Sequence, residues 1–292
     1  MIFMSLLHDI EKTHFSPSEE EVIKYVLDKK DEIENMTLAM IAEETYTSAP
    51  ILVRVAKKLG FNGWNEFKEA FLSEIDFLNK EAEIDASIPF VVSDTYTTIA
   101  SNIAKLEMES IQDTLDLLSH DDLQKAMRLL SETSHIDVYG ISNNLLLAQE
   151  FAEKMFYIGK NVNIATLSGD AKMQATMSNE THCAILISYS GETNFMVDVA
   201  EILSNKHTPM ISITSLGDNS LSAKAQVNLR ISSKEMIQTK IGDFSSSQSI
   251  KTILDILYGC IFSLNYEENL ENKIQFAKEL EDRHSGFEFI DE

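Results

Sequence analysis

Five short apolar runs, separated by longer stretches, most constrain what the second half of this chain can fold into. The runs lie at residues 136–140, 162–165, 183–188, 210–214 and 227–231. Amphipathic stretches long enough for helices lie between or after them, at residues 145–158, 194–204 and 247–264. Strands that alternate with helices in this way form βαβ units with a mostly parallel sheet. We therefore predict an α/β domain with a doubly wound, flavodoxin-like parallel sheet.

The first third of the chain has the pattern of short helices. Ser16, followed by a proline and acidic residues, predicts one helix start, and Thr37 can cap a second helix over residues 38–44. A third helix is predicted from Ser48 to the residue before Gly60. Two short helices joined by a turn of about four residues are typical of a helix-turn-helix. We therefore predict an all-α domain ahead of the α/β domain.

Charge limits the kinds of partner this chain can bind. The net charge is −23, from 24 basic and 47 acidic residues. Such a balance disfavours nonspecific binding to nucleic acid, but a protein that reads a DNA groove needs only a local basic patch. Residues 45–65 hold no acidic side chain, and basic side chains lie within or just after them: Arg54, Lys57, Lys58 and Lys68. Two interpretations are open, a solvated helix face or a DNA contact.

Cysteine usage and hydropathy bear on the compartment. The two cysteines, Cys183 and Cys260, match no metal or redox spacing, which is typical of a reducing compartment. The first ten residues carry no basic segment of the kind that opens a signal peptide. The longest apolar run is far shorter than the ~20 residues of a transmembrane helix. We therefore expect a cytoplasmic protein.

Two predicted loops are rich in hydroxyl groups. The first follows the strand over residues 136–140 and the second follows the strand over residues 183–188; their polar or flexible residues are Gly140, Ser142, Asn143, Asn144, Ser188, Ser190, Gly191 and Thr193. Backbone N–H groups at a helix start favour an anion, and hydroxyls add neutral donors. The two loops therefore predict a phosphate site. The P-loop motif and the dinucleotide fingerprint are both absent from the sequence, so we expect neither an NTPase nor an NAD-binding protein.

These motifs resemble a known family. The strand followed by Gly-x-Ser and the Ser-x-Ser-Gly-x-Thr loop resemble a SIS (sugar isomerase) domain over residues 135–265. The Lys-Leu-Gly-Phe and Glu-Phe-Lys runs within residues 57–68 resemble the amino-terminal domain of the RpiR-type (MurR/RpiR) bacterial transcriptional regulators. The resemblance implies a helix-turn-helix domain over residues 1–77, a helical linker over 78–127 and a phosphosugar-binding SIS domain over 128–292.

The resemblance also implies two sets of binding residues. The phosphate of a sugar phosphate would be held by Ser142, Asn143, Ser188, Ser190, Gly191 and Thr193. DNA would be contacted by Thr47, Ser48, Arg54, Lys57, Lys58 and Lys68. Arg54 and the hydroxyls would meet base edges or phosphates in the major groove, and the lysines would mainly hold the DNA backbone.

On this resemblance, the protein is expected to regulate transcription rather than to catalyse a reaction. Its operator would be double-stranded DNA, its effector a hexose or amino-sugar phosphate, and its targets genes of carbohydrate or amino-sugar catabolism. Helix-turn-helix readers generally act as dimers, so we expect a homodimer or a dimer of dimers. We expect neither a metal nor an organic cofactor.

Three positions depart from the expected pattern or raise a question of charge. Tyr46 stands where the turn of the helix-turn-helix usually has glycine or a small residue, and Ser247 stands where relatives often carry arginine. The Glu192 carboxylate lies inside the second hydroxyl loop and would repel a phosphate. We therefore expect its side chain to face solvent or a sugar hydroxyl.

Two questions stay open from the sequence. A long amphipathic helix predicted over residues 97–118 can either pack on the following domain or form a dimer contact. The alternative function is a SIS-type sugar-phosphate isomerase with an accessory helical domain, which needs a general base. Candidate bases are Glu150, Glu153, His182 and His207. The basic helix-turn-helix segment favours the regulator, since an isomerase has no use for it.

Overall fold

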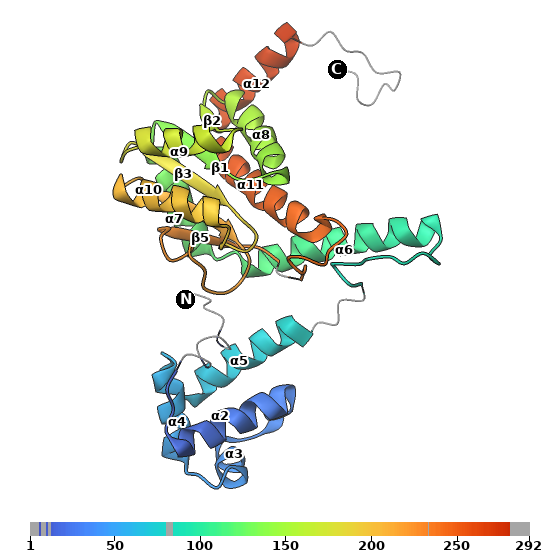
Figure 1. The fold of residues 1–292 in the computed structure, drawn as a ribbon, viewed down its shortest axis with the longest axis vertical. Helices are drawn as coiled ribbons and strands as arrows, with labels where there is room; N and C mark the ends of the chain where they lie inside the picture. Colours follow the sequence, from blue (N-terminus) through green and yellow to red (C-terminus); the bar gives the residue numbers. More distant parts are fainter. Residues whose placement is uncertain (1–5, 7–9, 11–12, 80–83, 233, 281–292) are drawn as a thin grey trace. The chain divides into compact units, whose positions relative to one another are not determined.

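The protein divides into two compact units. The structure is a computed structural model that describes residues 6, 10, 13–79, 84–232 and 234–280 (Figure 1). The first unit holds the chain up to Ile84 together with the short stretch Leu216–Asp218, and the second unit holds the rest of the chain from Asp85 onward. Each unit has its own buried apolar core.

The described helices of the first unit confirm the predicted helix-turn-helix. They are α2 (Pro17–Lys29), the 3₁₀ helix η1 (Lys30–Asn35), α3 (Leu38–Glu44), α4 (Ala49–Lys58) and α5 (Trp64–Asn79). The Thr37 side chain accepts a hydrogen bond from the Met40 backbone N–H, and this fixes the start of α3. The core is closed by stacked rings on α5, where Trp64, Phe67 and Phe71 are all buried.

The turn between α3 and α4 has an unusual backbone conformation. Tyr46 has a φ of 51°, in the left-handed region that favours glycine. Its side chain is 97% exposed, so no packing on the described residues holds it there. The neighbouring hydroxyls do hold the turn, since Thr45 Oγ1 donates to the Ile41 carbonyl at 2.7 Å and lies 2.8 Å from Thr47 Oγ1.

The second unit contains a five-stranded parallel sheet with the order β2-β1-β3-β4-β5. The strands are β1 (His135–Tyr139), β2 (Val162–Ile164), β3 (His182–Ile187), β4 (Met210–Thr214) and β5 (Val227–Arg230). The helices are α6 (Tyr96–Leu117), α7 (His120–Glu132), α8 (Asn143–Phe156), α9 (Ser168–Met177), α10 (Asn194–Asn205), α11 (Phe244–Leu264) and α12 (Tyr266–Leu280). Every strand pair is parallel, which confirms the predicted α/β doubly wound class.

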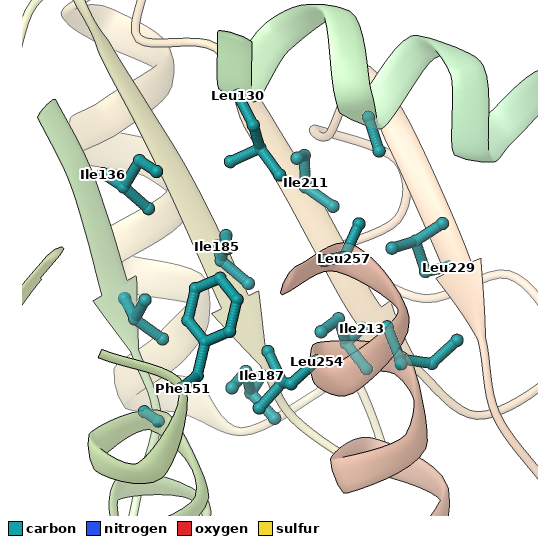
Figure 2. Close-up of a cluster of buried hydrophobic side chains, with 14 of the residues drawn as sticks. Leu130, Ile136, Phe151, Ile185, Ile187, Ile211, Ile213, Leu229, Leu254 and Leu257 are labelled. Atoms are coloured by element: carbon teal, nitrogen blue, oxygen red, sulfur yellow. The ribbon is translucent and has the colours of Figure 1, made fainter. Parts of the chain in front are cut away.

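Helices cover both faces of the sheet (Figure 1). Helices α7, α8 and α11 pack on one face, where Leu130, Phe151 and Leu257 meet strand residues such as Ile185 and Ile211 (Figure 2). Helices α9 and α10 cover the other face, where Tyr139, Leu186 and Leu203 are among the buried side chains. Because both faces are covered, the strands read as continuous apolar runs in the sequence.

Helix α6 packs along α11 within the second unit. Ser110 of α6 donates a hydrogen bond from Oγ to Ser245 Oγ at 2.6 Å, and both side chains are buried. The helix predicted over residues 97–118 therefore packs on the following domain, which was one of its two interpretations.

Among the described helices, none combines the length and the apolar character needed to cross a bilayer.

Candidate functional site

The two hydroxyl-rich loops meet between β1 and β3, where the strand order of the sheet reverses. Strand β1 lies between β2 and β3, so the chain leaves β1 toward one edge and leaves β3 toward the other. Ligands bind at such a switch point in open α/β sheets because the two connections open a crevice there. A cavity of about 390 Å³ lies at this place, lined by residues of both loops.

Four of the predicted phosphate ligands line this one cavity: Ser142, Ser188, Ser190 and Thr193. Ser188 Oγ lies 3.1 Å from Thr193 Oγ1, so two of the hydroxyls pair with each other. Ser190 Oγ accepts a hydrogen bond from the Glu192 backbone N–H at 3.2 Å. Asn144 also lines the cavity, and its amide donates to the Ile187 carbonyl at the end of β3.

The hydroxyls stand at two helix starts. Ser142 precedes α8 and Thr193 precedes α10, and among the described residues neither side chain caps its own helix. Both helix starts therefore keep backbone N–H groups and a hydroxyl for a ligand. This arrangement suits an anion with several acceptor oxygens.

Each of the two loops contains one residue with a positive φ value. Ser142 has a φ of 54°, which is uncommon for a residue with a Cβ atom. Gly191 has a φ of 66°, and a Cβ atom built there would lie 2.1 Å from the Asn219 side chain. Strained residues that a fold retains cluster at functional sites, and these two lie in the loops that form the cavity.

One basic side chain at the cavity was not singled out from the sequence. Lys240 lies in the stretch between β5 and α11, and its Nζ is 2.6 Å from Asp243 Oδ1 and 2.9 Å from Glu235 Oε2. Burial by itself would lower the pKa of Lys240, but the hydrogen bonds to Asp243 and Glu235 raise it above its ordinary value. Lys240 therefore brings a permanent positive charge to the lining, beside the carboxylate of Asp243.

The start of α11 is already occupied by a carboxylate of the chain itself. Glu235 is fully buried, and its carboxylate accepts hydrogen bonds from the Ser246 backbone N–H at 3.0 Å and from Ser246 Oγ at 2.6 Å. The Ser245 backbone N–H donates to it as well. An anionic ligand is thus directed to the starts of α8 and α10 rather than to α11.

Asn143 belongs to a second, adjoining cavity. This space of about 300 Å³ is lined by residues of α6, α8 and α11, among them Glu107, Asn143, Ser247 and Lys251. Asn143 Nδ2 donates to Ser247 Oγ at 2.6 Å, so the serine at the position of the usual arginine is bonded to the first loop. Asp243 lines both cavities, and the two therefore share a border.

The candidate general bases lie elsewhere. The residues that line the first cavity are all described, and Glu150, Glu153, His182 and His207 are not among them. Hydrogen bonds from Lys154 and Lys251 lower the pKa of Glu150, which fits an ion pair between α8 and α11. His182 stands at the opposite end of β3 and its Nδ1 lies 2.7 Å from Asp137 Oδ2.

Glu192 faces solvent, as expected, and it also makes hydrogen bonds within the protein. Its carboxylate accepts hydrogen bonds from the Ser220 backbone N–H and from Ser220 Oγ, each at 2.7 Å. The side chain is exposed and pairs with a neighbouring loop, so its charge is partly satisfied within the protein.

Among the described residues, no group of three or more His, Cys, Asp or Glu side chains is arranged to hold a metal ion.

The predicted DNA contacts differ in how free their side chains are. Ser48, Arg54 and Lys57 are exposed at the start and along the surface of α4. Thr47 is half-buried and its hydroxyl lies 2.8 Å from that of Thr45. Three of the six positions thus present exposed polar groups on a single helix.

Lys58 and Lys68 make contacts inside the first unit. Lys58 Nζ lies 2.6 Å from Glu19 Oε2, and this pair ties α4 to α2. The hydrogen bonds from Lys58 and from the Ser16 backbone N–H lower the pKa of Glu19 to about 2. Lys68 Nζ donates to the carbonyls of Glu34 and Met36, at 2.6 and 2.9 Å.

Sequence models and curated relatives place the two units in known families. A model described as "SIS domain" matches residues 129–257, and one described as "Helix-turn-helix domain, rpiR family" matches residues 4–76. An uncharacterized HTH-type transcriptional regulator of Caldanaerobacter subterraneus subsp. tengcongensis is 25% identical over 258 residues, which are 87% of this chain and 88% of that protein. Another from Clostridium perfringens is 25% identical over 274 residues, 93% of this chain and 97% of that protein.

Solved structures share the fold. The Vibrio vulnificus NanR protein, complexed with ManNAc-6P, has a TM-score of 0.59 at 20% identity and matches 95% of this chain and 98% of that chain. The sugar isomerase domain of an RpiR transcription factor from Sphaerobacter thermophilus has a TM-score of 0.54 at 13% identity, with 61% of this chain and 98% of that chain covered. A putative sugar-phosphate isomerase of Listeria monocytogenes has a TM-score of 0.54 at 20% identity, covering 64% of this chain and 99% of that one. The same fold is thus present in regulators and in a putative enzyme.

Proposed function

Since the chain belongs to the RpiR-type transcriptional regulators, with a helix-turn-helix domain and a SIS domain, we propose that a sugar phosphate bound in the SIS domain controls DNA binding. The observation that carries this proposal is the cavity lined by Ser142, Ser188, Ser190 and Thr193. The binding of the sugar phosphate and the binding of the operator are then linked by a coupling free energy.

The phosphate group fits the hydroxyl-lined end of the cavity. Its oxygens would accept hydrogen bonds from the four hydroxyls and from the backbone N–H groups at the starts of α8 and α10. The Ser188–Thr193 hydrogen bond would open so that both hydroxyls donate to the ligand. Lys240 would supply a charge-assisted hydrogen bond to the phosphate. This chain has Ser247 at the position where relatives often carry an arginine, so Lys240 is the basic side chain that lines this cavity.

The sugar fits the adjoining polar space. Asp243 borders both cavities and can accept hydrogen bonds from hydroxyl groups, and Asn143 offers an amide on the same side. The NanR protein, which has the same fold, is complexed with ManNAc-6P, an amino-sugar phosphate. We accordingly expect a hexose or amino-sugar phosphate as effector, and target genes in carbohydrate or amino-sugar catabolism.

The DNA contact is assigned to the exposed part of α4. Ser48 and Arg54 would reach base edges or phosphates of the major groove, and Lys57 would bind the DNA backbone. Thr47, Lys58 and Lys68 were predicted as contacts too, but their contacts within the unit support a role in stabilising its fold. A pair of half-sites and a homodimer of the chain are the expected arrangement on DNA.

A thermal-shift screen of sugars and their phosphates tests the ligand. A ligand at about 100 times its Kd stabilises the native state by about 2.7 kcal/mol, which raises the melting temperature by several degrees. We expect this shift with phosphorylated sugars and not with the same sugars lacking the phosphate. Equal shifts with both members of a pair would contradict the phosphate site.

Two variants locate the site. Ser190→Ala combined with Thr193→Val removes two hydroxyls at the cavity and should abolish the shift. The control, Ser204→Ala combined with Thr176→Val, removes the same atoms at exposed positions and should keep it. An assay for aldose–ketose interconversion on the same samples distinguishes the regulator from the isomerase, because turnover would show that the cavity is catalytic.

A further inference from the structure

We propose that Ser87 couples the sugar-phosphate cavity to the segment that leads out of the helix-turn-helix unit. The inference rests on the proposed function and adds the place at which ligand binding is sensed. Ser87 lies just after the boundary between the two units, and both it and the contacts described below belong to the second unit.

Ser87 holds both ends of one segment beside the cavity. The Met236 backbone N–H donates to Ser87 Oγ at 2.8 Å, and the Ile241 backbone N–H donates to the Ser87 carbonyl at 2.9 Å. Ser87 is itself buried, and its own N–H donates to Asp85 Oδ1 at 2.8 Å. The side chain and the backbone of one residue therefore fix the position of the segment over residues 236–241.

This segment forms part of the cavity lining. Ile237 and Lys240 both line the cavity, and they lie between the two anchoring N–H groups. Lys240 Nζ also lies 4.9 Å from the centre of the Tyr189 ring. A phosphate that draws Lys240 toward itself would therefore pull on the segment that Ser87 holds.

A second connection runs from the hydroxyl loop to the same segment. Tyr189 stands between Ser188 and Ser190, and its hydroxyl donates to the Glu235 carbonyl at 2.7 Å. The same hydroxyl accepts from the Glu235 backbone N–H at 3.0 Å. Hydrogen bonds and the chain itself thus connect the phosphate loop, through Glu235 and the segment 236–241, to Ser87.

The segment is held by polar contacts rather than by a core. Met236, Ile237 and Ile241 are 64%, 65% and 52% exposed, so their side chains contribute little packing. A segment with few buried apolar contacts can change position at low free-energy cost. A coupling element needs more than one accessible arrangement, and the small apolar contact area of this segment lowers the free-energy cost of a second one.

The chain beyond Ser87 is anchored, which gives a shift of Ser87 a direction. Asn102 Nδ2 of α6 donates to the Pro89 carbonyl at 2.9 Å, and the Phe90 ring packs edge-on against Phe244 at the start of α11. Toward the amino terminus, Ser87 is preceded by Ile84, the last residue before the second unit begins. A displacement of Ser87 is thus resisted on the side of α6, and the stretch over residues 84–86 is where we expect a response to be measurable.

Hydrogen–deuterium exchange on the full chain, with and without inorganic phosphate at matched ionic strength, tests the inference. We expect saturating phosphate to change amide exchange at least about threefold in the two hydroxyl loops, and also at Met236, Ile241 and residues 84–88. Ser87→Ala removes the contact with the Met236 N–H and keeps the contact between the Ile241 N–H and the carbonyl of residue 87. In this variant the loops should respond as before, while the response of residues 84–88 should fall to less than half of that in the wild type. Ser93→Ala, an exposed serine of the same stretch, is the matched control and should behave as the wild type.

The outcomes separate the two proposals. If phosphate protects the hydroxyl loops of the wild type but leaves residues 84–88 unchanged, the coupling through Ser87 is wrong and the phosphate site stands. A response of residues 84–88 that is as large in Ser87→Ala as in the wild type overturns the coupling as well. If phosphate changes the exchange of neither region, the phosphate site itself is wrong, and the inference fails with it.

Discussion

Replacing Lys58 by alanine should destabilise the helix-turn-helix unit, whereas the same change at the neighbouring Lys57 should leave its stability within about 0.5 kcal/mol of wild type. Both residues end α4 and both were predicted from the sequence to bind DNA. Lys58 Nζ lies 2.6 Å from the Glu19 carboxylate, which is only 2% exposed, while Lys57 is exposed. Removing Lys58 leaves a buried carboxylate without its cation.

The expected loss is about 1–2 kcal/mol. The pKa of Glu19 falls from 4.5 to about 2, which corresponds to a ceiling of about 3.4 kcal/mol at about 1.36 kcal/mol for each pH unit. Part of that decrease comes from the Ser16 backbone N–H, which the variant keeps. The Lys58 side chain is 37% exposed, so solvent screens its share of the interaction further.

Trp64 provides the assay. It is the single tryptophan of the chain and is buried in the core of the first unit, so its fluorescence in the full chain reports the unfolding of that unit. Urea titrations of wild type, Lys58→Ala and Lys57→Ala compare the midpoints directly. Midpoints that coincide for the two variants would refute the structural role of Lys58.

The pH dependence gives a second check. The folded-state pKa of Glu19 lies below its ordinary value, so its stabilising contribution is complete above about pH 4.5 and is lost as the pH falls toward 2. The stability gap between wild type and Lys58→Ala should therefore shrink between pH 5 and pH 2.

Lys57→Ala should instead weaken DNA binding and lower the slope of log affinity against log salt by about 1.

Three further results are expected. Gly191→Ala should cost more stability than Gly159→Ala, because both glycines have positive φ values but only Gly191 would drive a Cβ into the Asn219 side chain; equal melting temperatures would contradict the close approach. Tyr46→Gly should raise the stability of the first unit by up to about 1 kcal/mol, since it relieves a left-handed backbone, and a lower stability in the urea titration would contradict that. Burial raises the pKa of Cys183 to about 12, so iodoacetamide at pH 8 should leave this thiol unmodified in the folded protein, as read by mass spectrometry.

The pattern of the sequence was sufficient for most of the sheet. Strands such as β3 and β4 are buried on both faces and therefore appear as continuous apolar runs. Helix α9 was not predicted because the side chains that it buries are small, notably Ala171 and Ala175, while its Met173 and Met177 are exposed. A helix that packs through alanines lacks the apolar periodicity on which such a prediction depends.

The candidate site was predictable only where it follows the strands. Ser142 and Ser190 come directly after β1 and β3, so the parallel topology alone brings them to one edge. Lys240 and Ser87 lie in irregular stretches, where no periodic pattern marks a residue. The contact of Ser87 with Met236 and that of Lys240 with the Tyr189 ring each join residues far apart in the chain. The internal partner of Lys58 is likewise a residue on another helix, which spacing along the sequence does not reveal.

Operator affinity in the presence and absence of the effector tests the central claim most directly. A DNA fragment selected for binding from a random library would be titrated with wild type and with Ser190→Ala/Thr193→Val, each with and without the sugar phosphate that stabilises the wild type. Wild type should change its Kd for DNA by about 5–150-fold on addition of the effector, and the double variant should bind DNA with the same Kd in both conditions. A double variant that responds to the effector as the wild type does would contradict the account.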